Sequence, residues 1–449
     1  MSGIAGIYNL DGRPVDPALL KRMTDVISHR GPDGVGHWID GPVGLGHRML
    51  CTTPESLRES QPLLDETERL CLTFDGRIDN REELAKSLKA KGALLRDDTD
   101  AELVLKAYEY WGVRSPKHIV GDFAFVLWDG HSRELFCARD FLGLKPFYYI
   151  RTGRSFLFGS ELKQIFEDDT NRREPNEGMI GEYLASAITD KEETLCKNVF
   201  RLPPGHSLLI RPGLFHKQCY WAIPTREVRY RRDEDYAEHF LEIFKEAVRC
   251  RLRSQTPVGV SLSGGLDSSS IMVVAQALCN EGGVPAAKCE AFSLVFPGLP
   301  CDESLYIQEV MRFCGASGHR LLQPQVDIDY YSRQAAAYYD FPGYPNGNGC
   351  MASPIKRMLQ EKGWRVLLNG VGGDEWLTGS SYYYAELLRN FRLSDLLHEF
   401  RFDIRTAGMR RGSSRLMRYG VRPLIPKAPR RIIAGLFTSH VPSSSWSWI

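Results

Sequence analysis

The chain lacks the features that mark membrane, secreted and metal-binding proteins. No apolar run reaches the ~18 residues of a membrane span, and residues 1–6 lack the basic flank of a signal peptide. The 11 cysteines include no Cys-x-x-Cys pair, and His29, His37 and His47 do not have metal-ligand spacing. We therefore expect a cytoplasmic protein with no membrane partner, zinc, iron–sulfur cluster or disulfide framework.

The chain also lacks an excess of charge of either sign. A net charge of +1 with 25% charged residues argues against a general nucleic-acid binder and against a disordered chain. The 449 residues exceed what one hydrophobic core usually serves, so two domains are expected.

One short stretch carries the clearest chemical signal. The apolar residues 258–262 predict a buried strand, and the pattern of residues 271–278 predicts a helix. Between them, Ser263, Gly264, Gly265, Asp267 and Ser268 form what we call the 263–268 turn. Adjacent glycines allow close backbone approach, and a helix start attracts anions, so phosphate or pyrophosphate is the expected ligand. The spacing matches neither a P-loop nor a Gly-x-Gly-x-x-Gly motif.

The first half of the chain reads as β-rich with two helices. Short apolar or alternating segments separated by turn residues suggest two packed sheets. Asp98 and Thr99 are candidate caps of the second helix. The expected strands are residues 3–9, 43–50, 70–74, 121–128, 134–139 and 156–158, and the expected helices are residues 16–28 and 100–111.

The second half alternates helices and strands, which predicts a doubly wound parallel sheet. A polar stretch at residues 224–235 reads as a linker. Loops after two strands, residues 263–268 and 369–375, are then expected at one sheet edge, where Asp267 and Asp374 are candidate Mg²⁺ ligands. The expected elements are helices at residues 236–252 and 302–313, the latter capped by Asp302, and strands at residues 291–296 and 365–369.

The order of motifs resembles the glutamine-hydrolysing asparagine synthetases. The resemblance implies an N-terminal-nucleophile-type αββα sandwich at residues 1–222, a linker at 223–235 and an ATP pyrophosphatase domain at 236–449. It covers residue 2 to about residue 384. The motifs are SHRGPDG at 28–34, GHR at 46–48, DG at 75–76, DFAF at 122–125, RDFLGLKP at 139–146, SELK at 160–163, LPPGH at 202–206 and the 263–268 turn.

Three departures lie in the glutamine pocket that the resemblance implies. The cysteine nucleophile of the family is Ser2 here, whose hydroxyl is harder to activate. The carboxylate-binding arginine position is Met49, with Arg48 one residue earlier and so on the opposite strand face. The oxyanion-binding asparagine before Gly76 is Asp75, which has no proton to donate.

These losses predict an inert glutaminase domain with an architectural role. Asp100, which matches the acid that holds the glutamine amine, is retained. We interpret His29, Arg30 and His47 as residues that support the fold.

The resemblance assigns ATP and Mg²⁺ to the second domain. The implied nucleotide-binding residues are Leu262, Ser263, Gly264, Gly265, Asp267, Ser268, Leu294, Asn369 and Gly370, with Asp267 and Asp374 on the metal. Leu262 and Leu294 would be core residues in any such sheet.

The amine side of the reaction departs from the family as well. Val371 stands where the family has a glutamate near the reacting amine, and an aliphatic side chain cannot accept a proton. The strings at residues 376–380 and 382–384 are similar to those of lasso peptide cyclases, which join a side-chain carboxylate to the peptide's own N-terminal amine.

The C-terminal part of the chain is basic. It fits a solvated helix face or a surface for a precursor peptide, and no match to the family's transition-state lysine is visible beyond Lys427. The chain is thus expected to be a fragment, a natural truncation, or a complete chain that needs a partner. The basic residues are Arg405, Arg410, Arg411, Arg415, Arg418, Arg422, Lys427, Arg430 and Arg431.

The leading hypothesis is an ATP-dependent amide ligase that activates a small-molecule or peptide carboxylate. Peptide macrolactam formation leads over asparagine synthesis from ammonia or glutamine. A non-catalytic binding or regulatory subunit is the second class, and a homodimer is compatible with either.

Overall fold

A computed structural model describes residues 1–224, 228–286, 288–322, 329, 333, 353–377 and 380–425. The chain forms two compact units, Met1–Asn369 and Gly370–Ile449. The first unit contains two regions, which we call the sandwich (residues 1–221) and the parallel-sheet region (residues 233–369).

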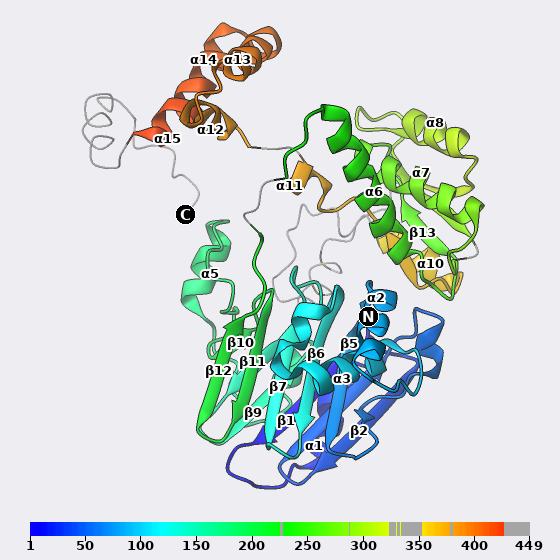
Figure 1. Ribbon diagram of the computed structural model, residues 1–449, viewed down its shortest axis with the longest axis vertical. Coiled ribbons are helices and arrows are strands. Elements are labelled where there is room, and N and C mark those ends of the chain that lie inside the picture. Colours follow the sequence, from blue (N-terminus) through cyan, green and yellow to red (C-terminus); the bar gives the residue numbers. More distant parts are fainter. Residues whose placement is uncertain are drawn as a thin grey trace. The chain divides into compact units, whose positions relative to one another are not determined.

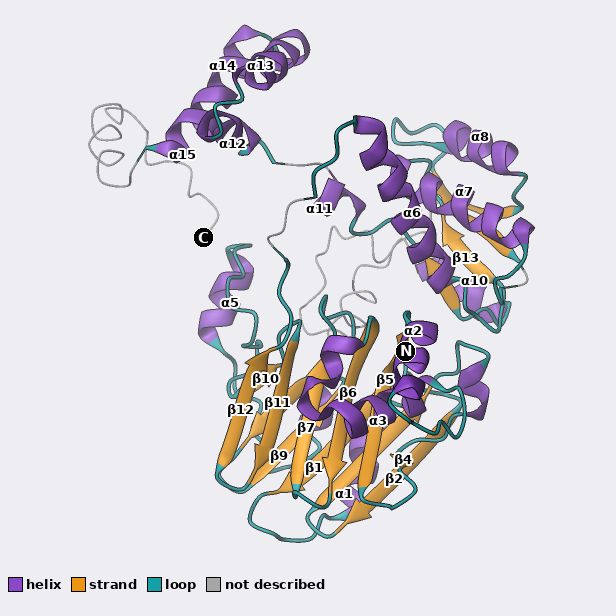
Figure 2. Ribbon diagram, in the orientation of Figure 1, coloured by secondary structure: helices purple, strands orange, loops and turns teal. Residues whose placement is uncertain are grey.

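The sandwich is built from two six-stranded antiparallel sheets that face one another (Figure 1, Figure 2). A core that includes Ile4, Trp128 and Phe156 fills the space between the sheets. The first sheet has the order β10 (Val199–Arg201), β8 (Tyr148–Arg151), β9 (Ser155–Gly159), β1 (Gly3–Asn9), β3 (Val43–Met49) and β2 (Gly34–Asp40); the second has the order β12 (Leu214–Cys219), β11 (His206–Arg211), β7 (Glu134–Arg139), β6 (Gly121–Asp129), β5 (Leu70–Ile78) and β4 (Leu63–Leu64).

Helices cover the outer face of each sheet, which completes the predicted αββα order. The first sheet packs against α1 (Pro17–Asp25) and α4 (Leu162–Ile165). The second packs against α2 (Arg81–Ala90) and α3 (Asp100–Trp111). The remaining helical segments of the sandwich are α5 (Glu177–Leu184) and the 3₁₀ helices at Glu55–Arg58 and Gly112–His118.

Helix α1 lies close to the sheet because β3 carries glycines under it. Asp16 caps the helix by accepting the Ala18 N–H at 2.9 Å. A Cβ atom at Gly46 would meet the Thr24 methyl group at 2.5 Å, so a larger residue there would push the helix away. The glycines therefore set the distance between α1 and the sheet.

Where the sequence has a strong local pattern, the predicted bounds of an element agree with the structure. β1 (Gly3–Asn9) and α3 (Asp100–Trp111) end where they were predicted to, and the predicted Thr99 cap is confirmed by its acceptance of the Glu102 N–H at 3.3 Å. β5 continues past its predicted end to Ile78, so Asp75 lies inside a strand. Within the sandwich, the sequence patterns did not predict β2, β4, β8, β10, β11, β12, α2, α4 and α5.

The parallel-sheet region has the strand order β15-β14-β13-β16, with all pairs parallel. The order reverses beside β13, as expected for a doubly wound sheet. The elements are α6 (Asp233–Arg251), β13 (Val258–Ser261), α7 (Leu266–Glu281), β14 (Cys289–Val295), α8 (Ser304–Cys314), β15 (Gly318–Leu322), α10 (Ser353–Glu361) and β16 (Val366–Leu368).

Apolar side chains cover both faces of this sheet. On one face, Ala291 of β14 shares a core with α6, α7 and α8. On the other, Phe292 packs against Leu359 of α10. Two details differ from the prediction: α6 begins inside the predicted linker, and Glu303 rather than Asp302 is the N-cap of α8. Asp302 instead accepts the Phe296 N–H and the Ser304 hydroxyl.

The second unit is helical in its described residues. Its small core includes Tyr384, Leu387 and Leu396, and the Tyr384 hydroxyl donates to Asp403 at 2.9 Å. It contains α11 (Gly373–Leu377), α12 (Tyr383–Arg389), α13 (Leu393–Ala407), α14 (Met409–Arg415), a π-helix at Leu416–Val421, and α15 (Arg422–Leu424).

The basic residues predicted at this end are solvent-facing as far as residue 422. Arg405, Arg410, Arg411, Arg418 and Arg422 are exposed. Arg415 is exposed too and pairs with Asp403 at 2.9 Å. Lys427, Arg430, Arg431, Thr378 and Gly379 lie outside the described residues. Within the described ranges, every helix is too short or too polar to cross a membrane.

Candidate functional site

A cluster of buried charges occupies the first predicted pocket. Asp75 on β5 is 1% exposed, and its carboxylate lies 3.3 Å from the Arg30 guanidinium and 3.1 Å from Nζ of Lys145. Burial alone would raise the pKa of Asp75, but the two cations outweigh burial and hold that pKa below its usual value. The position therefore carries a paired carboxylate and no hydrogen-bond donor.

A second acid, Glu161, completes this cluster. Its carboxylate accepts from His29 at 2.9 Å and from Arg30 at 3.3 Å, and it pairs with Lys163 at 2.9 Å. Arg30 also donates to the Ser2 carbonyl at 2.9 Å, and the Ser2 hydroxyl accepts the Leu50 N–H at 3.0 Å. These contacts tie the N-terminus of the chain to β3 and to the start of α4.

Arg48 is turned away from this cluster. Its guanidinium donates to the Thr24 carbonyl at 3.0 Å and to Asp25 at 2.6 Å, at the end of α1. His47, its neighbour on β3, is buried and contacts the Thr73 hydroxyl at 3.2 Å, and burial lowers its pKa to about 4. A neutral, buried His47 fits a role in supporting the sheet.

Asp100, the acid expected to hold a substrate amine, is occupied by arginines of the chain itself. It is 5% exposed at the start of α3. Arg81 lies 2.7 Å from one carboxylate oxygen. Arg253, from the parallel-sheet region, donates to both oxygens at 3.1 and 2.7 Å, and the Ile78 N–H donates at 3.0 Å. Three hydrogen bonds and one further ion pair therefore surround this carboxylate.

Arg253 belongs to a set of contacts that joins the two regions of the first unit. It also pairs with Glu55 at 3.2 Å. Arg251 contacts Asp79 and lies 2.9 Å from Asp122. Farther along, Arg365 donates to both oxygens of Asp33, and Gln255 donates to the Cys51 carbonyl at 2.6 Å.

The 263–268 turn connects β13 to α7. Gly264 has φ of +90°, and a Cβ atom there would lie 2.9 Å from Cβ of Tyr306, so both the backbone angle and the packing require glycine. The Ser263 and Ser268 hydroxyls lie 3.0 Å apart, and the Gly265 N–H donates to the Ser263 hydroxyl at 3.4 Å. The turn is small and polar, and Ser263 is exposed.

Other predicted nucleotide residues lie along the same sheet edge. Leu262 directly follows β13, and its N–H donates to the Phe292 carbonyl at 3.0 Å. Leu294 is on β14, and Asn369 follows β16, the strand that pairs with β13. Leu262 is a core residue with 1% exposure, and Leu294 is half-buried. The sheet thus gathers the turn, Leu294 and Asn369.

The remaining predicted residues belong to the second unit. Gly370 begins that unit, Val371 is 85% exposed, and Asp374 is exposed on α11. Asp267, in the first turn of α7, is half-buried. Within the described residues, no three or more His, Cys, Asp or Glu side chains form a group that could hold a metal ion.

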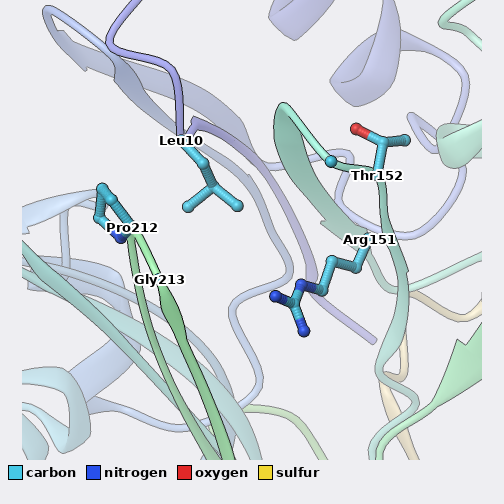
Figure 3. Close-up of a pocket in the computed structure, with 6 residues that line it drawn as sticks. Leu10, Arg151, Thr152, Pro212 and Gly213 are labelled. Carbon is cyan, nitrogen blue, oxygen red and sulfur yellow. The ribbon is translucent and has the colours of Figure 1, made fainter.

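A hollow of the sandwich shares no lining residue with either candidate site. It has a volume of about 500 Å³ and lies at the tips of β1, β8 and the β11–β12 turn (Figure 3). Arg151 lies over the Phe215 ring at 4.7 Å, so its cation is already engaged. Its lining residues are Leu10, Arg151, Thr152, Gly153, Pro212 and Gly213.

The residues that fill the first pocket were not predicted from the sequence. Lys145 and Glu161 lie within the RDFLGLKP and SELK motifs, which assign them no role. Arg81 and Arg253 lie outside the motifs that carry the resemblance. The sole available signal was charge balance, since a buried Asp75 or Asp100 requires a cation nearby.

The fold and two family matches define the class of this protein. A family model described as a glutamine amidotransferase domain matches residues 1–221, and one described as asparagine synthase matches residues 239–444. The chain is therefore an amidotransferase-type domain followed by a synthase-type domain.

Curated relatives assign the family. Asparagine synthetase 3 (glutamine-hydrolyzing) of Bacillus subtilis is 28% identical over 398 residues, covering 86% of this chain and 64% of that protein. A protein of Methanocaldococcus jannaschii, named as a second glutamine-hydrolyzing asparagine synthetase, is 30% identical over 415 residues, covering 88% and 77%. Amidase chry2 of Gibberella zeae is 28% identical over 421 residues, covering 86% and 60%. The chain belongs to the glutamine-hydrolysing asparagine synthetase family.

The chain spans 60% to 77% of the length of these three relatives. Among solved structures, glutamine phosphoribosylpyrophosphate amidotransferase from B. subtilis, complexed with ADP and GMP, gives a TM-score of 0.38 at 14% identity. That match covers 82% of this chain and 90% of the solved chain.

Proposed function

We propose that this chain is an ATP-dependent, AMP-forming amide ligase. A substrate carboxylate oxygen attacks the α-phosphorus of ATP, and pyrophosphate leaves. An amine then attacks the activated acyl carbon, and AMP leaves as the amide forms. Family membership supports the reaction class.

The geometry of the 263–268 turn carries this proposal. The turn lies where the strand order reverses, the usual place for a ligand in an open parallel sheet. Gly264 keeps side-chain atoms away, and the exposed Ser263 hydroxyl lies just before α7, 3.0 Å from the buried Ser268 hydroxyl. These groups would bind the pyrophosphate portion of ATP and stabilise charge on the leaving group. Leu262, Leu294 and Asn369 would border the adenosine.

Mg²⁺ would be held by Asp267 together with phosphate oxygens. One carboxylate fits this role because Mg²⁺ keeps several waters and needs few protein ligands when phosphates supply the rest. The ion would neutralise charge on the phosphates while the carboxylate attacks.

We further propose that the sandwich does not hydrolyse glutamine. Asp75 is an ionised carboxylate paired with Arg30 and Lys145, so it would repel an oxyanion. Asp100 is already paired with Arg81 and Arg253. The sandwich then serves as a support for the parallel-sheet region, through the arginine contacts that join them.

The amine is proposed to arrive on the substrate itself, as in a peptide macrolactam. Val371, in place of an acid, and the altered glutamine pocket both support an amine that is neither ammonia nor derived from glutamine. Asparagine synthesis from ammonia or glutamine is the alternative, and two of the relatives are named as glutamine-hydrolyzing asparagine synthetases.

A pyrophosphate-release assay on the full chain tests the proposal. The purified chain with ATP and Mg²⁺ is offered three substrates separately: aspartate with ammonia, aspartate with glutamine, and a peptide with a free N-terminal amine and an internal aspartate or glutamate. We expect release and peptide cyclisation in the last arm alone. Release only with ammonia would assign asparagine synthesis, and glutamine-driven release would contradict an inert sandwich. Silence in all arms would contradict a ligase and favour a non-catalytic relative.

A matched pair of variants links the activity to the turn. Asp267→Asn should lower pyrophosphate release by roughly 10²-fold through loss of electrostatic stabilisation. Glu281→Gln makes the same change of charge at the exposed far end of α7 and should leave release unchanged. Equal effects of the two variants would contradict the proposed role of Asp267.

A further inference from the structure

Two cysteines of the parallel-sheet region have their sulfur atoms in contact. Sγ of Cys279, in the last turns of α7, lies 3.0 Å from Sγ of Cys289, the first residue of β14. Both side chains are free thiols. A disulfide bond needs the sulfurs to approach to about 2.05 Å, so a small rotation of the side chains would complete it.

The segment between the two cysteines leaves room for that rotation. Gly282 and Gly283 follow α7 with φ of +75° and +90°, and a Cβ atom on either would meet no neighbour within 4 Å. The ring that a bond would close is short, and its ends are already in contact. The entropy cost of closing it is therefore small.

The two thiols differ in exposure, which gives them different roles. Cys289 is 2% exposed, whereas Cys279 is half-buried and within reach of solvent. The hydrogen bond from Cys289 is the main cause that lowers the pKa of Cys279, and the same contact raises the pKa of Cys289. Cys279 is thus the thiol that meets an external oxidant first.

We propose that Cys279 and Cys289 form a reversible dithiol–disulfide site, oxidised by a small-molecule disulfide such as oxidised glutathione. The Cys279 thiolate attacks the glutathione disulfide, which breaks its S–S bond and releases one glutathione thiolate. Cys289, after losing its proton, attacks Sγ of Cys279 and releases the second glutathione. Two thiols and one oxidised glutathione become one protein disulfide and two reduced glutathiones.

The site acts on the helix that carries the 263–268 turn. α7 begins at that turn and ends beside this pair, so oxidation fastens the C-terminal end of the helix to the strand β14. The bond should slow local opening of the segment between them. This inference stands on thiol geometry alone and holds whether or not the chain is a ligase.

Thiol mapping on the full reduced chain tests the site. The chain is equilibrated with glutathione mixtures of increasing oxidised fraction, blocked with an alkylating reagent, digested and analysed by mass spectrometry. We expect two fewer alkylated thiols and one new cross-linked peptide that joins Cys279 to Cys289, both reversed by dithiothreitol. A stable glutathione adduct on Cys279, or a cross-link to another cysteine, would overturn the proposal.

Variants sharpen the result. Cys289→Ser should abolish the cross-link and leave a glutathione adduct on Cys279. Cys314→Ser is the matched control, because Cys314 is also half-buried in this region but donates to the Val310 carbonyl at 3.0 Å. It should leave the cross-link intact. Loss of the cross-link in the control would overturn the assignment. Mapping of the wild-type chain decides the question even if a variant folds poorly.

Discussion

The two candidate sites differ in what satisfies their polar groups. In the sandwich, the chain supplies its own counter-ions: Arg30 and Lys145 meet Asp75, and Arg81 and Arg253 meet Asp100. The 263–268 turn contains serines and glycines, and the hydroxyls of Ser263 and Ser268 bond to each other and to backbone N–H groups of the same turn. The first site is organised for stability, whereas the second has the form of a ligand cradle.

This difference teaches how a binding pocket can become structural. A buried acid costs free energy unless a cation accompanies it, whether that cation is a substrate ammonium or an arginine. Once Arg253 from the neighbouring region provides the charge, the pocket joins two regions of the chain. Loss of an ion pair in the sandwich pocket should therefore lower stability. A change in the backbone shape of the 263–268 turn should instead lower activity.

The largest expected effect is on the turn. Gly264→Ala should lower ligase activity by at least ~10²-fold, because the new methyl group collides with Tyr306 and shifts the backbone that we propose binds phosphate. Gly283→Ala is the matched control, since Gly283 has the same φ of +90° but open space around it. Pyrophosphate release measures activity, and denaturant unfolding measures stability. Each variant should lose about 1 kcal/mol of stability from the left-handed backbone. Retained activity in Gly264→Ala would contradict the cradle.

The next effect is on the buried cluster. Lys145→Met should destabilise the chain by about 3 kcal/mol, because it removes one of the two cations from a fully buried Asp75. Asp75→Asn in the same background should recover part of that loss. Denaturant unfolding of the two single variants and the double variant measures the coupling. Strictly additive losses would show that the two side chains do not interact.

The same pair predicts a dependence on pH. The pKa of Asp75 is lowered in the folded chain, so its pairing contributes full stability above its unfolded pKa of about 4. That contribution is lost as the pH falls through the lower folded pKa. Asp75→Asn should therefore flatten the acid limb of the stability curve.

The smallest effect is a graded series at the contact between the regions. Arg253→Met should cost about 2–3 kcal/mol, because Arg253 is 12% exposed and serves two acids. Arg251→Met should cost about 1 kcal/mol, because Arg251 is 32% exposed. Arg249→Met, which removes an exposed pair with Glu246, should cost a few tenths of a kcal/mol. Unfolding free energies in any other order would contradict the view that burial decides the cost.

Much of the fold could be predicted from the sequence, because local patterns determine it. β1 is apolar throughout, and α3 combines a threonine cap with a helical period, so both were located to the residue. Weakly patterned elements were missed. β12, for example, has the sequence LFHKQC and is only partly buried, so it gains its stability from pairing with β11.

The candidate sites divide in the same way. The turn was readable because glycine and serine requirements are local. The partners of Asp75 and Asp100 come from distant segments, with Arg253 lying 153 residues from Asp100 in sequence. No periodicity in one sequence reports which arginine crosses between regions, so these contacts required the three-dimensional fold.

The glycines of β3 also determine which groups the Arg48 guanidinium can reach. Arg48 can reach the Thr24 carbonyl and Asp25 only because α1 packs closely against the backbone of β3. A methyl group at Gly46 would lift the helix and pull those acceptors out of reach. The Arg48 guanidinium would then lose its two hydrogen-bond acceptors. A steric change on the outer face of the sheet would therefore leave an unpaired positive charge at the edge of that sheet.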